Sequence, residues 1–186
     1  MDLLCETPRA WVDLAVERFD EVLVDHAHCE KKAAASALSL IAAFPSVPGL
    51  ARAMARLVRE EAAHLAQVLA LLEKRGLSLG RDPGDPYAQA LQQMVRQPVR
   101  ERLLDRLLVS AAIEARSEER LRLLGTHLPD PELRHFYGRL AGAERGHAEL
   151  FLRLARRCDG FQQRLEEVRA AEAALLRALP LRAAIH

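Results

Sequence analysis

The chain has 186 residues, of which 50% are hydrophobic and 4% aromatic, and its formal net charge at pH 7 is +1. Three scattered cysteines form no Cys-x-x-Cys pair, which excludes a zinc ribbon and a disulfide framework. No apolar run is long enough to span a bilayer and the N-terminus lacks the pattern of a signal peptide, so a cytoplasmic protein is expected.

Prolines and glycines divide the chain into helical segments. Abundant Ala, Leu, Arg and Glu favour helix throughout. Four long helices are predicted over about residues 8–44, 48–75, 98–124 and 131–158. A short helix near residues 85–96 connects the second to the third, and a last helix covers about residues 162–179. The expected fold is all-α: one ferritin-like four-helix bundle domain over residues 1–186, with a short crossover helix and a C-terminal helix.

The same pattern of metal-binding side chains occurs in both halves of the chain. Each half has one glutamate followed, 31 or 30 residues later, by a Glu-x-x-His pair. The six residues are Glu30, Glu61, His64, Glu114, Glu144 and His147. Residues three apart on a helix share a face, so each pair directs a carboxylate and an imidazole to one point. Four carboxylates and two imidazoles from four helices are typical of a two-iron centre.

The helix breaks support this interpretation. Facing residues of a helical hairpin are equally far from its turn. The midpoint between Glu30 and Glu61 falls in the break FPSVPG, and the midpoint between Glu114 and Glu144 falls at Pro129, in the break HLPDP. Each pair of carboxylates is therefore expected at matched depth, roughly 15–20 Å inside its helices, where a charged group is costly unless it binds metal or is paired.

Two further pairs have ligand spacing but lack a partner. Glu132-x-x-His135 lies in the first turn of its helix, and we interpret it as a surface pair. Asp25-x-x-His28 has no counterpart in the second half, and we expect it near the surface or behind the ligands. The six-residue set itself suits iron or manganese, and it departs from the tetrahedral sites of zinc.

The sequences around the predicted ligands carry a more specific signal. They are DHAHCEKKAAASAL (25–38), LVREEAAHLAQVLALLEKRGL (57–77), LLVSAAIEARSEERL (107–121) and FYGRLAGAERGHAELFLRLA (136–155). Together they resemble the MiaE family, the tRNA 2-methylthio-N6-isopentenyladenosine hydroxylases, over roughly residues 8–160. The resemblance implies the same six ligands, two non-haem iron ions, O₂ as co-substrate and an external electron donor, a protein or reductase.

The resemblance also implies that the isopentenyl group of the modified adenosine at tRNA position 37 is hydroxylated. Phosphates of the anticodon loop need basic side chains, and the candidates are Arg96, Arg100, Arg102 and Arg106. A monomer or small oligomer without membrane contact is expected. The ligand repeat alone leaves other ferritin-like diiron proteins open, namely a ferroxidase or iron-storage protein and a small-molecule hydroxylase.

Overall fold

The computed structural model describes residues 1–186 and contains seven α-helices and no β-strand. The helices are α1 (Arg9–Glu17), α2 (Phe19–Ala43), α3 (Leu50–Lys74), α4 (Pro86–Gln93), α5 (Val99–His127), α6 (Pro131–Ala155) and α7 (Phe161–Ala178). The predicted long helices, the short connecting helix and the C-terminal helix are all present. None of the seven combines the length and apolar character that a membrane span requires.

The chain divides into two compact units. The α2–α3 unit comprises Arg18–Pro83 and Ala183–Ile185. The α1/α4–α7 unit comprises Met1–Glu17, Gly84–Arg182 and His186. The structure establishes compact packing within each unit. That residues 1–186 form one domain therefore stays a prediction.

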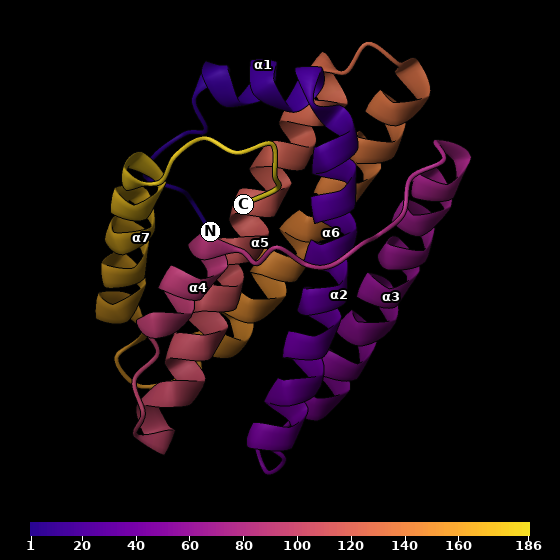
Figure 1. The fold of residues 1–186 in the computed structure, drawn as a ribbon. Helices are drawn as coiled ribbons and strands as arrows, with labels where there is room; N and C mark the ends of the chain where they lie inside the picture. The colour runs from indigo at the N-terminus through magenta and orange to yellow at the C-terminus, as the bar shows by residue number, and fades with distance from the viewer. The chain divides into compact units, whose positions relative to one another are not determined.

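In the α2–α3 unit, the two helices form an antiparallel hairpin and lie side by side (Figure 1). The break FPSVPG ends α2, and Gly49, with a φ of 80°, precedes α3 in a left-handed conformation that favours glycine. One stripe of α3, including Leu57, Glu61 and Val68, is buried. The Arg75 guanidinium pairs with Asp20 at 2.6 Å and joins the other ends of the two helices.

In the α1/α4–α7 unit, α5 and α6 form the central hairpin, and α1, α4 and α7 pack around it (Figure 1). The Asp130 carboxylate accepts hydrogen bonds from the Glu132 and Leu133 backbone N–H groups and starts α6. The predicted end of α5 at residue 124 is wrong, since α5 continues to His127. Gly125 lies within α5, and a Cβ at this position would lie 2.9 Å from the Gly138 backbone nitrogen, so close packing rather than helix termination explains the glycine.

Two other predicted boundaries differ. The helix predicted over residues 8–44 is interrupted at Arg18, whose φ of −111° and ψ of 41° lie outside the helical region. Neither glycine nor proline marks this interruption. The Arg18 carbonyl accepts the Glu21 N–H, and its guanidinium bonds the Glu21 carboxylate at 2.7 and 2.6 Å, so a new helix begins there. The helix predicted over 131–158 ends at Ala155, where the chain turns toward the left-handed Gly160 that precedes α7.

Candidate metal centre

The α2–α3 unit brings together the three predicted ligands of the first half. Glu30 lies on α2, and Glu61 and His64 lie on α3. The His64 Nδ1 atom is 3.6 Å from Glu30 Oε2 and 3.4 Å from Glu61 Oε2. Both carboxylates are buried, and the potential ligand atoms of the three residues lie within 4.8 Å of one another. The matched depth predicted from the break FPSVPG therefore holds in this hairpin.

The α1/α4–α7 unit contains an equivalent cluster. Glu114 lies on α5, and Glu144 and His147 lie on α6. The His147 Nδ1 atom is 3.3 Å from Glu144 Oε2, and the potential ligand atoms of the three residues lie within 4.8 Å of one another. All three side chains are buried. Each unit thus carries one cluster of two carboxylates and one imidazole.

The donor chemistry of these clusters fits a transition-metal ion. Taking ionised carboxylates out of water is unfavourable unless a cation or a hydrogen-bond donor compensates them. Carboxylate and imidazole are hard-to-borderline ligands that suit iron or manganese. Two equivalent clusters, each with two carboxylates, supply four negative charges, which two divalent ions would balance. The residues present therefore fit the iron that the sequence predicts.

Sequence reasoning missed one buried residue beside the first cluster. His26 Nε2 lies 2.7 Å from Glu30 Oε1, and His26 is 1% exposed. The second carboxylate oxygen, Glu30 Oε2, is the one that faces His64. The spacing of four residues on α2 places His26 and Glu30 on one helix face, and this spacing could have indicated the contact from sequence.

The two pairs set aside from the sequence have other roles. Glu132 and His135 are exposed, as predicted for a surface pair. His28 is buried, and its Nε2 lies 3.1 Å from the Leu79 carbonyl oxygen, so it contacts the segment that follows α3. Asp25 is also buried and accepts a hydrogen bond from the Ile185 N–H at 2.7 Å. These contacts are internal to the α2–α3 unit and account for Asp25 and His28 without a metal.

Of the four arginines predicted to contact RNA, Arg96 and Arg100 line one pocket, and Arg102 and Arg106 lie on another side of α5. Arg96 binds the Asp105 carboxylate with two nitrogens, at 2.9 and 2.8 Å, and Asp105 is fully buried. Burial alone would raise the pKa of Asp105, but hydrogen bonds from Arg96 and Arg164 outweigh it and lower that pKa. Arg96 thus pairs with a buried carboxylate while its own side chain stays 39% exposed. On α5, Arg102 and Arg106 lie roughly 200–240° around the helix axis from the exposed Arg100, so they point to a different side of the helix. RNA contact by these four arginines stays a prediction.

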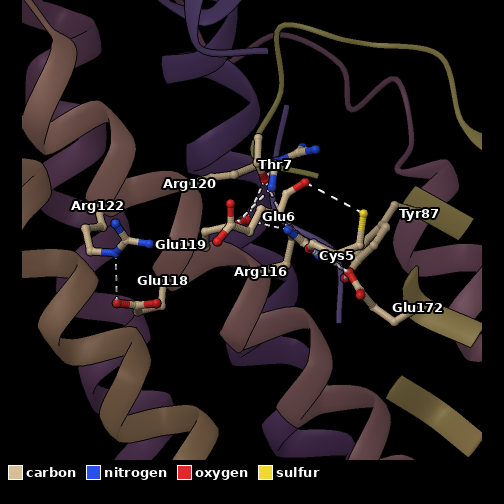
Figure 2. A network of polar contacts seen from close by, with 10 residues as sticks. All are labelled: Cys5, Glu6, Thr7, Tyr87, Arg116, Glu118, Glu119, Arg120, Arg122 and Glu172. Atoms are coloured by element: carbon tan, nitrogen blue, oxygen red, sulfur yellow. Dashed lines mark hydrogen bonds and ion pairs between the residues drawn. The ribbon is translucent and has the colours of Figure 1, made fainter. Parts of the chain in front are cut away.

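The residues that follow Glu114 form a buried polar network (Figure 2). The Arg116 guanidinium is fully buried and bonds the carboxylates of Glu172 and Glu119. Its Nη2 also donates to the Cys5 carbonyl at 2.8 Å. Tyr87 donates to Glu172 at 2.9 Å, and burial together with the Glu172 charge raises the pKa of Tyr87 well above its usual value. The segment IEARSEER therefore ties the N-terminal segment, α4 and α7 to the helix that carries Glu114.

Comparison with known proteins agrees with these features. The model of a family described as tRNA-(MS[2]IO[6]A)-hydroxylase (MiaE) matches residues 2–186. A tRNA 2-(methylsulfanyl)-N(6)-isopentenyladenosine(37) hydroxylase from Pseudomonas putida is 41% identical over 175 residues, covering 92% of this chain and 85% of that protein. A solved structure, protein 43 with aldehyde deformylating oxygenase activity from Synechococcus, is 38% identical and covers 99% of this chain and 94% of its own, with a TM-score of 0.94.

The structural likeness confirms the predicted all-α, ferritin-like fold class. The family match spans nearly the whole chain and includes both Glu and Glu-x-x-His sets. The resemblance seen in the four ligand segments is therefore confirmed, and the chain belongs to the MiaE family of tRNA hydroxylases.

Proposed function

We propose that this protein is an O₂-dependent monooxygenase that hydroxylates the isopentenyl group of 2-methylthio-N6-isopentenyladenosine at position 37 of tRNA. The observation that carries the proposal is the pair of equivalent, buried clusters of two carboxylates and one imidazole in a chain of the MiaE family. The Pseudomonas putida relative, named for this reaction, supports the choice of substrate.

The two clusters would supply the ligands of two iron ions in all. The proposed ligands are Glu30, Glu61, His64, Glu114, Glu144 and His147. When bound, the iron pair supplies the activation of O₂ that insertion of oxygen into a C–H bond requires. The protein's part is to balance the metal charge with four carboxylates, to orient the two imidazoles and to limit the access of water. Electrons would come from an external donor protein or reductase, in the cytoplasm where tRNA is modified.

The direct test supplies the iron-loaded protein with O₂, a reductant and tRNA that carries the isopentenylated adenosine. The tRNA is then digested to nucleosides and analysed by mass spectrometry. The expected result is a gain of one oxygen atom on the modified adenosine, with ¹⁸O incorporated from ¹⁸O₂. If the nucleoside keeps its mass in the presence of loaded protein and reductant, the assignment to this substrate is wrong.

A small-molecule oxygenase is the second candidate. The Synechococcus protein, at a TM-score of 0.94 and 38% identity, is described as having aldehyde deformylating oxygenase activity. The same loaded protein and reductant, given an aldehyde instead of tRNA, distinguishes the two. Release of formate without any change in the tRNA nucleoside would favour this alternative.

His26 is expected to set the binding mode of Glu30. Because the His26 ring nitrogen lies 2.7 Å from Glu30 Oε1, one carboxylate oxygen is occupied and Oε2 is left to face the metal. A His26→Ala variant is expected to bind Fe²⁺ or Co²⁺ about 10–100-fold more weakly, the usual effect of losing a hydrogen bond to a ligand. Metal titration followed by absorption of the Co²⁺ form checks this.

The conservative variant His26→Gln retains an N–H donor, and it is expected to recover most of the affinity and the Co²⁺ spectrum. Equal affinities and spectra for wild type and His26→Ala would show that this contact does not act on the metal.

A further inference from the structure

The part of the α2–α3 hairpin between the ligand cluster and the turn carries charge of one sign only. From Glu30 to the next acidic residue, Glu60, the chain has five charged residues, and all are basic. They are Lys31, Lys32, Arg52, Arg56 and Arg59. The segment covers the second half of α2, the turn and the first ten residues of α3. This end of the hairpin is therefore strongly basic in a protein that is nearly neutral as a whole.

Three of these residues form a row that we call the arginine stripe: Arg52, Arg56 and Arg59. Spacings of four and three residues place them on one face of α3, and all three are exposed. The buried residues Met54, Leu57 and Glu61 lie on the opposite face. The stripe therefore faces away from the core of the hairpin, toward solvent.

Several basic groups of this unit are neutralised by carboxylates, whereas the stripe is neutralised little. Lys31 and Lys32 share Asp82, at 3.4 and 3.9 Å, and Arg75 pairs with Asp20. Arg52 and Arg56 form no ion pair, and Arg59, whose side chain is 77% exposed, only reaches Glu60 at 3.9 Å. The first turn of α3 has no acidic residue and no side-chain cap, so the positive end of the helix dipole adds to the potential.

A row of cations with this geometry fits a chain of phosphates. The stripe rises roughly 10 Å along α3 at 1.5 Å per residue, and guanidinium groups bind phosphate with paired hydrogen bonds. We propose that the arginine stripe binds consecutive backbone phosphates of the tRNA substrate. Phosphate contacts fix position rather than sequence, so the stripe would hold the RNA on the helix that carries Glu61 and His64. This assignment of the stripe to tRNA rests on the proposed function.

The test measures binding of tRNA carrying the isopentenylated adenosine to the full-length, iron-loaded protein under anaerobic conditions. The triple variant Arg52→Gln/Arg56→Gln/Arg59→Gln is compared with wild type over a range of salt concentrations. Expected are a loss of affinity of about 10–100-fold at 0.1 M salt, and a slope of log K against log salt reduced by about 2. In turnover, KM for tRNA rises and kcat is unchanged.

A matched control removes the same charge from the other unit. Arg9, Arg153 and Arg177 are also exposed, and the variant Arg9→Gln/Arg153→Gln/Arg177→Gln is expected to bind tRNA within threefold of wild type. Unchanged tRNA affinity in the stripe variant, or an equal loss in the control, overturns the assignment. So does a stripe variant that binds tRNA normally but loses binding to vesicles of anionic lipid or to an acidic electron-donor protein.

Binding and hydroxylation separate the two proposals. Wild-type protein that binds tRNA through the stripe but adds no oxygen contradicts the proposed function and leaves the stripe in place. If wild-type protein hydroxylates tRNA and the stripe variant has the same KM for tRNA, only the assignment of the stripe is contradicted.

Discussion

A Glu114→Ala variant is expected to retain at most one iron ion per chain after anaerobic loading and to lose hydroxylation of tRNA. Glu114 is buried on α5, and its carboxylate lies within 4.8 Å of the ligand atoms of Glu144 and His147. Its removal takes away one of the two carboxylates of that cluster. Elemental analysis for iron and mass spectrometry of tRNA nucleosides measure the two effects separately.

Thermal unfolding gives a readout independent of turnover. A ligand that binds only the folded state stabilises it, by about 2.7 kcal/mol when present at a hundred times its Kd. Iron is therefore expected to raise the Tm of wild type more than that of Glu114→Ala.

The matched control is Glu132→Ala, which removes an exposed glutamate from the other Glu-x-x-His pair of α6. It should bind iron and act on tRNA as wild type does. Full iron content and turnover in Glu114→Ala would remove Glu114 from the proposed centre, whatever the control shows.

Spacing rules explain why the ligand clusters were predictable from sequence. Residues three apart on a helix share a face, and hairpin partners lie equally far from their turn. These two rules, applied to Glu30 with Glu61 and to Glu114 with Glu144, predicted the two carboxylate pairs that the structure brings together. The helix breaks were marked by proline and glycine, so the order of the elements was predictable as well.

Features that depend on side-chain contacts were not predictable in this way. The interruption at Arg18 has no glycine or proline to mark it, and it depends on local bonds to Glu21. The helical Gly125 was interpreted as a helix end because its reason, the approach of Gly138, lies on another helix. The bond from Arg96 to Asp105 was not predicted, since it becomes known only once the segment after α4 packs against α5.

The largest effect on stability is expected at Arg116. Its guanidinium is fully buried, bonds Glu172 through Nε and Nη2 at 3.0 and 2.7 Å, and also bonds Glu119 (Figure 2). Removing one partner of a buried ion pair leaves the other charge without compensation and typically costs about 3–5 kcal/mol. Arg116→Ala is expected to lose this amount, with a fall in Tm of roughly 10 °C at about 2–4 °C per kcal/mol. Chemical and thermal unfolding measure it.

Two further variants separate charge from packing. Arg116→Met/Glu172→Leu removes both charges and keeps much of the volume, so it is expected to be more stable than Arg116→Ala, because Glu172 no longer remains as a buried carboxylate without its guanidinium partner. Arg145→Ala breaks the exposed pair with Glu118, whose nitrogen–oxygen distance is also 2.7 Å, and it should change stability little, since solvent screens this pair. If Arg116→Ala were as stable as Arg145→Ala, the buried network would not hold the N-terminal segment and α7 to the helix of Glu114.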